Sequence, residues 1–290
     1  MLILFLTICF FTHVIIGNST VNNELVRDKY ATKKDKQVSD FHSHDLTDAE
    51  YGYVVTLVQI KQMIVTTHCT GSMIHKNWIL SSAHCFYDLT KRKFYAWYGN
   101  FTVSPLVSEL YSEVAKIFIH PEFLNTAFTS PGYFFGDNDI SLLRVGKVSL
   151  PKYGRLSTID HTKMHGLRVK YIGGAPKSRS DGEMRPLQIG EGVVVGCGMA
   201  LTRWSKYALC VTPKCSQKLH QPLHGDMGGP FLYDGKIVGV MSSSYQIPKT
   251  LLSSNGLTPV SPYRDWVEKV RESFGKANET KTKPNDNKAR

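Results

Sequence analysis

Short apolar runs separated by turn residues recur along the chain from about Asp45 onwards. Runs of this kind, rich in β-branched and aromatic residues, are typical of short antiparallel strands. Their spacing predicts an all-β sandwich or barrel. The strands predicted from the pattern are Tyr53–Ile60, Gly71–Ile74, Trp78–Ser81, Phe94–Tyr98, Val114–Ile119, Arg168–Ile172, Gly192–Gly196, Pro230–Tyr233 and Ile237–Met241.

A helical periodicity follows the last of these runs. Over Ser261–Phe274 the apolar residues recur three and four positions apart, which is the spacing of one helix face. Pro262 suits the first turn of such a helix, because its missing N–H is not needed there. The residues from Lys276 onwards are polar, and we predict an unstructured basic tail at 276–290.

The first residues form an uncharged apolar run that ends in small residues near Gly17. This pattern predicts a secretory signal peptide at 1–17 and therefore a secreted, extracellular protein. The alternative is an N-terminal membrane anchor, but the run is short for a membrane span and polar sequence follows it directly. We expect a folded region at 45–275, with halves at about 45–150 and 151–275.

The formal net charge is +11, and basic residues crowd a polar, flexible lead at 18–44 and the tail. One interpretation is two solvated ends, and the other is adhesion to polyanionic glycans or anionic lipid. No nucleic-acid-binding motif accompanies the charge, so nucleic acid is not an expected partner. The basic residues concerned are Arg27, Lys29, Lys33, Lys34, Lys36, Lys276, Lys281, Lys283, Lys288 and Arg290.

Six cysteines are present, and Cys9 lies in the predicted signal peptide. In an oxidising compartment the other five allow two disulfides and leave one thiol. Three Asn-x-Ser/Thr sequons, at Asn18, Asn100 and Asn278, are glycosylation candidates if they are exposed. Pairs of neighbouring histidines lack the cysteine or acidic ligands of a known metal pattern, so no metal and no cofactor is expected.

Three segments carry the chemistry of the chain. They read WILSSAHC at 78–85, DNDISLL at 137–143 and GDMGGP at 225–230. In this order they resemble the histidine, aspartate and serine motifs of the trypsin/chymotrypsin family. The resemblance covers roughly Tyr51 to Phe274. It implies two six-stranded antiparallel β-barrels with a C-terminal helix.

The resemblance also implies roles for individual residues. His84 would be the general base, and Asp139 would hold its tautomer. Met227 stands where the family carries its serine, so the triad is degenerate: a thioether has no proton to give to a base and cannot form an acyl-enzyme. The backbone N–H groups of Gly225 and Met227 would form the oxyanion hole.

Two disulfides follow from the same resemblance. A bridge between Cys69 and Cys85 would pin the histidine loop. For Cys197 the preferred partner is Cys210, because the spacing resembles a loop bridge of the family, and Cys215 is the alternative.

Several positions depart from the family pattern. In the family a new amino terminus pairs with the acid before the serine, here Asp226, yet no activation sequence stands upstream of the first predicted strand. Gln221 lies roughly where the specificity residue at the base of the substrate pocket would be, which excludes a trypsin-like acid. The groove strand normally reads Ser-Trp-Gly, whereas here it reads Ser242, Ser243, Ser244, which removes an aromatic wall.

These features predict a secreted serine-protease homologue without peptidase activity. It would bind extracellular proteins, such as active proteases or their substrates, as a non-cleaving cofactor, decoy or scaffold. Two alternatives are an active serine-type endopeptidase of the same family with a non-standard mechanism, and a basic surface-adhesion module that works through its ends.

Overall fold

The computed structural model describes residues 50–125, 136–173, 186–197, 206–212, 224–246 and 253–279. All of them fall in one unit, Ser43–Arg290. The predicted signal peptide and flexible lead lie outside the described residues. Within the described part of the chain, no helix has the length and apolarity needed to cross a membrane.

The first half of the described chain closes into a six-stranded barrel with the order β1-β2-β3-β8-β5-β4. Neighbouring strands are antiparallel, and side chains such as Leu57, Ile79 and Leu143 fill the interior without any exposed surface. The strands are β1 (Val54–Lys61), β2 (Ile64–His75), β3 (Trp78–Ser81), β4 (Tyr95–Trp97), β5 (Tyr111–Ile119) and β8 (Ser141–Val145). A separate two-stranded ribbon pairs β6 (Leu124–Asn125) with β7 (Gly136–Asp137).

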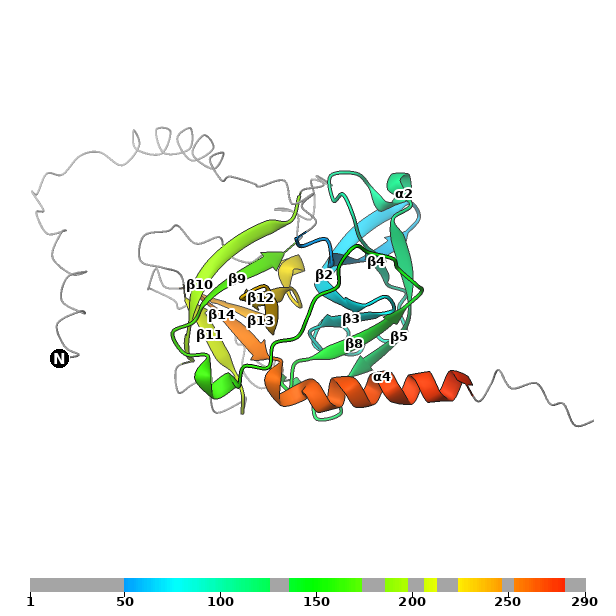
Figure 1. The fold of residues 1–290 in the computed structure, drawn as a ribbon. Coiled ribbons are helices and arrows are strands. Elements are labelled where there is room, and N and C mark those ends of the chain that lie inside the picture. The colour runs from blue at the N-terminus through cyan, green and yellow to red at the C-terminus, as the bar shows by residue number, and fades with distance from the viewer. Residues whose placement is uncertain are drawn as a thin grey trace, which may run out of the picture. The chain divides into compact units, whose positions relative to one another are not determined.

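The second half closes into another six-stranded antiparallel barrel with the order β10-β11-β14-β13-β12-β9. Its strands are β9 (Arg168–Gly173), β10 (Gln188–Gly196), β11 (Leu209–Thr212), β12 (Pro230–Tyr233), β13 (Lys236–Gln246) and β14 (Ser253–Pro259). Ile172, Phe231 and Met241 lie fully buried in it. The two barrels, shown in Figure 1, confirm the predicted fold class.

The C-terminal helix connects the two barrels. It follows the last strand of the second barrel and runs along the first barrel (Figure 1), where the ring of Phe274 lies 5.8 Å from that of Trp78 and 6.1 Å from that of Phe118. The helices are α2 (Pro105–Ser108), η2 (His161–Lys163), η3 (His224–Asp226), η4 (Ser261–Tyr263) and α4 (Arg264–Glu279).

Every predicted strand overlaps a strand of the structure, but several boundaries differ. β2 begins at Ile64 rather than Gly71, because its register with β1 extends the strand through polar residues that hide the apolar pattern. The sequence pattern did not predict β8, β11 and β14. The predicted tail begins too early, since α4 continues to Glu279: a last helical turn can be polar, because its backbone hydrogen bonds need no apolar side chain.

Candidate active site

His84 and Asp139 meet because their strands are neighbours. His84 follows β3 and Asp139 precedes β8, and these antiparallel strands pair through Ser81 and Ser141 at that end. The Asp139 carboxylate holds both the ring and the backbone of His84. Its Oδ2 lies 2.7 Å from Nδ1 of His84, and its Oδ1 accepts a hydrogen bond of 2.8 Å from the backbone N–H of His84.

Asp139 has a further partner that sequence reasoning did not identify. Ser242 Oγ, on β13 of the second barrel, donates a hydrogen bond of 2.5 Å to Asp139 Oδ2. The sequence placed Ser242 in a substrate groove and did not predict this contact. Because the Asp139 side chain is only 1% exposed, each of its oxygens depends on such protein donors. The His84–Asp139–Ser242 network, as we call these three residues, therefore links the two barrels.

Asn138 fixes the backbone beside Asp139. Its φ of 53° lies in the left-handed region, which asparagine enters more readily than most residues. Its side chain donates a hydrogen bond to the backbone carbonyl of Glu122 (2.9 Å) and accepts one from the Tyr263 hydroxyl (3.1 Å). Tyr263 belongs to η4, so the aspartate loop is anchored to the start of the C-terminal helix.

The surroundings of His84 favour its protonated form. Burial of the imidazole opposes the positive charge, but the charge of Asp139 and the hydrogen bond to it outweigh burial and raise the pKa of His84. An ionised carboxylate can only accept, so the neutral ring carries its proton on Nδ1. This tautomer leaves Nε2 as an acceptor, which is the arrangement of a general base.

The Cys85 sulfur lies near both this imidazole and the backbone of Met227. The Sγ of Cys85 lies 3.8 Å from His84 Nε2 and 3.9 Å from the carbonyl oxygen of Met227. Met227 follows η3 and is 6% exposed, so its side chain belongs to the hydrophobic core. At this position the chain offers a buried thioether and no hydroxyl proton.

Residues 224–229, which contain Met227 and which we call the 224–229 loop, have a backbone that is held from both barrels. Thr70 on β2 donates through its backbone N–H to the carbonyl of Met227 and through its hydroxyl to the carbonyl of Gly225, both at 2.8 Å. From the second barrel, the carbonyl of Met241 accepts a hydrogen bond of 2.7 Å from Gly228 N–H. The loop is therefore fixed by long-range contacts.

Gly228 is required for this docking. Its φ is +81°, and a Cβ there would stand 2.1 Å from Ser81 Oγ and 2.5 Å from the backbone carbonyl of Thr70. Only glycine combines this backbone angle with so close an approach. The loop keeps the conformation that its glycine permits, although the residue before that glycine is methionine.

The predicted oxyanion-hole residues, Gly225 and Met227, lie in η3 and directly after it. In a 3₁₀ helix, N–H groups bind carbonyls three residues earlier and so point back along the helix. An oxyanion hole needs N–H groups that point at the substrate oxygen. Gly225 lies in the first turn of η3, whose N–H groups have no partner within the helix, so only the Met227 N–H, directly after the turn, is placed to bind back into it.

Asp226 is buried against β9 of the second barrel, with 7% of its surface exposed. A Cβ on Gly173 would fall 2.2 Å from its Oδ1, so the carboxylate lies directly on that glycine. Burial and, after it, the charge of Asp226 raise the pKa of Tyr171. The predicted lack of an activating amino terminus concerns residues outside the described part of the chain.

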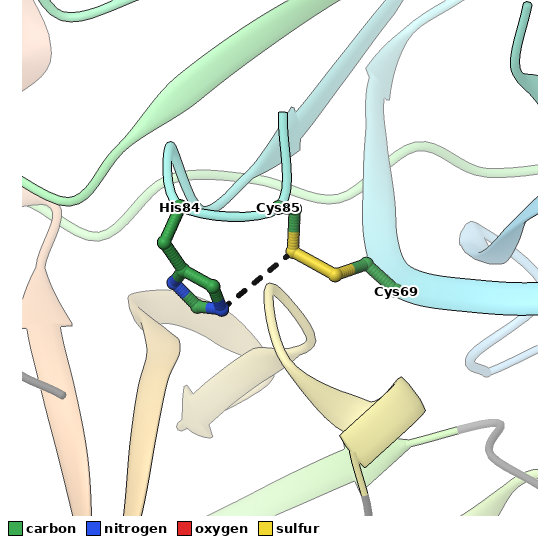
Figure 2. A group of neighbouring side chains, drawn as sticks. All are labelled: Cys69, His84 and Cys85. Atoms are coloured by element: carbon green, nitrogen blue, oxygen red, sulfur yellow. Dashed lines mark hydrogen bonds between the residues drawn. A yellow bond between two sulfur atoms is a disulfide. The ribbon is translucent and has the colours of Figure 1, made fainter. Parts of the chain in front are cut away.

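A disulfide joins Cys69 on β2 to Cys85 in the histidine loop. Figure 2 shows the Nε2 edge of the His84 ring directed at the sulfur of Cys85. The ligand-type atoms of these three residues lie within 4.8 Å of one another, a spacing that could hold a metal ion. Metal binding needs thiolates, however, and both sulfurs are engaged in the disulfide.

A second disulfide joins Cys197, at the end of β10, to Cys210 on β11. The alternative partner, Cys215, lies outside the described residues, as do Gln221 and Asn18. Asn278 lies in the last turn of α4.

Two other sets of predicted residues can be placed. The backbones of Ser243 and Ser244 pair with β14 after an irregularity at Met241. Asn100 is exposed, and its Oδ1 accepts hydrogen bonds from the backbone N–H (2.9 Å) and the hydroxyl (2.7 Å) of Thr102, the third residue of the sequon.

Two β-barrels with a His–Asp pair between paired strands define the class of trypsin-like serine endopeptidases. The family model described as Trypsin matches residues 43–267, and the chain belongs to this family. Chymotrypsin-like elastase family member 1 of Macaca fascicularis is 29% identical over 217 residues, which is 70% of this chain and 78% of the relative. Trypsin of Sus scrofa is 25% identical over 220 residues, with coverage of 70% and 84%.

Solved structures show the same fold. A structure titled HL collagenase aligns with a TM-score of 0.57 and 19% identity, covering 77% of this chain and 94% of that protein. A kallikrein-related peptidase 10 complex with Zn²⁺ aligns with a TM-score of 0.57 and 18% identity, with coverage of 78% and 98%.

Proposed function

We propose that this chain is a secreted trypsin-family homologue that does not hydrolyse peptides and acts by binding other proteins. The observation that carries the proposal is Met227, a buried residue where the family has its serine, whose backbone carbonyl lies near the same Cys85 sulfur as His84 Nε2. A serine hydroxyl gives its proton to the imidazole as its oxygen attacks the carbonyl carbon. A thioether sulfur already holds two carbon substituents and no proton, so no stable acyl-enzyme forms on it.

The shape of the 224–229 loop supports the same conclusion. The N–H of Met227 follows the η3 turn and is placed to bind back into it, while an acyl-transfer site needs this group at the developing oxyanion. Removing a single oxyanion-hole donor already costs a serine protease about 10²–10³ in kcat. The missing hydroxyl at position 227 and the position of the Met227 N–H after the η3 turn therefore oppose hydrolysis independently.

Retention of His84 and Asp139 has a structural explanation without catalysis. Asp139 is buried and joins the backbone of the histidine loop to Ser242 on the other barrel. Removing one partner from a buried, hydrogen-bonded charged group costs about 3–5 kcal/mol. The pair is thus needed for folding whether or not a proton is ever transferred.

Binding and secretion are the remaining parts of the proposal. Two disulfides suit an oxidising compartment, and the exposed sequon at Asn100 suits a glycosylated surface. Within such a compartment the partners would be active proteases or their protein substrates, with this chain as a non-cleaving cofactor, decoy or scaffold. The adhesion alternative rests on basic ends, of whose listed basic residues the described part of the chain includes only Lys276.

Labelling with a fluorophosphonate probe tests the loss of catalysis. We expect the purified full chain to take no label and to cleave no peptide in a mixed library, while an active trypsin-family enzyme does both. The matched control is His84→Ala, which removes the base and leaves Met227 in place. Labelling of the wild-type chain that disappears in His84→Ala would establish an active enzyme with a non-standard mechanism and overturn the proposal.

The binding role has its own measurement. Titration of the chain into an active trypsin-family protease acting on a protein substrate should change KM or kcat in a saturable way. His84→Ala should have the same effect, because the proposed role needs no proton transfer. Absence of any effect on the protease, together with absence of binding to its substrate, would argue against the cofactor and decoy roles.

A further inference from the structure

A cavity of about 320 Å³ lies between α4 and the first barrel. None of its lining residues belongs to the candidate active site. One wall comes from His75, Trp78 and Arg144 of the barrel, and the other from Arg271 and Phe274 of the helix. Two arginines and a histidine thus share a small pocket with two large aromatic rings.

The basic groups of this pocket carry unused hydrogen-bonding atoms. Nε of Arg144, Nε of Arg271 and Nδ1 of His75 are buried and have no hydrogen-bond partner within the part of the chain that the structure describes. Arg144 is nonetheless fixed in place, since its Nη1 donates to the carbonyls of Asn77 (3.2 Å) and Val145 (3.0 Å). Buried donors without acceptors are rare and costly in native proteins.

The charged side chains that line the pocket are two arginines and two glutamates, and the positive charges lie nearest to His75. Burial and then the nearby charges of Arg271, Lys76 and Arg144 lower the pKa of His75. Glu268 and Glu272 also line the pocket from α4, but both are exposed. Among the described residues, neither glutamate forms an ion pair within 4.0 Å of an arginine. The two half-buried arginines therefore have no ion-pair partner among the described residues.

Two aromatic rings, nearly perpendicular to one another, form an apolar corner beside the arginines. Trp78 is 5% exposed, and its ring meets that of Phe274 edge to face at 5.8 Å. The Arg144 guanidinium carbon lies 5.4 Å from the centre of the Trp78 ring and 5.3 Å from that of Phe274. Small-molecule sites typically combine such apolar walls with a few convergent polar groups.

We propose that this pocket binds an aryl carboxylate. Its ring would lie against Trp78 and Phe274, and its carboxylate would face Arg144 and Arg271. The two rim glutamates favour one negative charge over two. The same chemistry is offered by a free arylacetic acid and by a peptide that ends in phenylalanine with a free carboxylate, and the cavity has room for about one such group.

Titration calorimetry on the full chain tests the proposal with phenylacetate, 2-phenylethanol and phenyl phosphate. We expect phenylacetate to bind and to change the fluorescence of Trp78. The uncharged alcohol should bind at least about tenfold more weakly, because it forms no charge-assisted hydrogen bond. Phenyl phosphate should also bind more weakly. Absence of phenylacetate binding, equal binding of the alcohol, or tighter binding of the dianion would overturn the proposal.

Two substitutions on one helix locate the site. Arg271→Gln should weaken phenylacetate binding by about tenfold or more, while its neighbour Glu272→Gln should leave it unchanged or strengthen it. Equal effects of both substitutions, with unfolding midpoints like that of wild type, would contradict the placement of the ligand in this pocket.

Tripeptides ending in phenylalanine, as free acid and as amide, distinguish the two sources of an aryl carboxylate. Binding of the free acid alone points to a chain terminus, and binding of neither tripeptide points to a free small molecule.

Discussion

Two parts of the candidate site meet at the boundary between the barrels, and they differ in what remains of their chemistry. The His84–Asp139–Ser242 network contains the groups that orient the imidazole and favour its protonated form. The 224–229 loop contains the thioether of Met227, which under the proposed function stands where the family has its nucleophile. The network contributes buried hydrogen bonds between the barrels, so folding itself depends on it. A nucleophilic hydroxyl contributes little to folding, and a buried methionine adds apolar area to the core.

The backbone conformation of the 224–229 loop is held by contacts with other residues and not by the side chain at position 227. Gly228 keeps its left-handed angle, and Thr70 holds two carbonyls of the loop from the other barrel. These contacts involve no atom of the side chain at position 227. The comparison shows that a side chain used only for chemistry can be replaced while the surrounding structure stays, because that structure is stabilised by other groups.

The largest effect expected from this comparison concerns Met227→Ser. The substitution restores a hydroxyl at position 227. The η3 turn remains, however, and the N–H of residue 227 is still placed to bind back into it instead of pointing at a substrate oxygen. We expect kcat/KM on peptide substrates to stay well below about 10⁴ M⁻¹s⁻¹, the lower end for ordinary enzymes. The loss of a buried methionine should also destabilise the fold by about 2–4 kcal/mol. A value of kcat/KM at or above that limit would show that only the nucleophile is missing.

The next largest effect concerns Asp139→Ala. It leaves the backbone N–H and ring of His84 and the hydroxyl of Ser242 without their acceptor. We expect the free energy of unfolding, measured in urea, to fall by about 3–5 kcal/mol. The control is Glu113→Ala, which breaks an exposed ion pair with Lys93 and should cost about 1 kcal/mol or less. Similar losses in the two variants would show that the network does not stabilise the fold.

The two disulfides give a matched comparison of moderate size. They span 16 and 13 residues, so the chain-entropy model gives each about 3 kcal/mol. Cys69 and Cys85 also belong to the main hydrophobic core, whereas Cys197 and Cys210 form a small separate cluster. We expect the double alanine variant of the first pair to lower the free energy of unfolding more. An equal loss would leave chain entropy as the whole effect.

The smallest effect is the pH dependence of the network. The raised pKa of His84 means that the folded state binds its proton more tightly than the unfolded state does. This contribution is complete below about pH 6.5, the ordinary histidine value, and is lost as pH rises through the folded pKa. The gap in unfolding free energy between wild type and His84→Gln should therefore be larger at about pH 5.5 than at about pH 8.5. A gap in unfolding free energy that widens as pH rises would contradict a raised pKa for His84.

The sequence by itself determined the fold class and the main strands of both barrels. Short apolar runs bounded by turn residues identify a strand locally, as in Trp78–Ser81 and Pro230–Tyr233, which the structure reproduces without change. The family motifs, equally local, identified His84, Asp139 and Met227. The identity of one residue, a methionine without a transferable proton, carried the functional prediction.

Other features were decided only by the tertiary structure. The hydrogen bond from Ser242 to Asp139 joins residues 103 positions apart, and the sequence around neither residue predicts this contact. The contact of Asp226 with Gly173 and the pocket between Arg144 and Arg271 likewise depend on how strands and helix meet. Hydrogen bonds and charges act over a few ångströms in space regardless of separation along the chain. Only the closed barrels and the helix across them therefore determined which polar groups became neighbours.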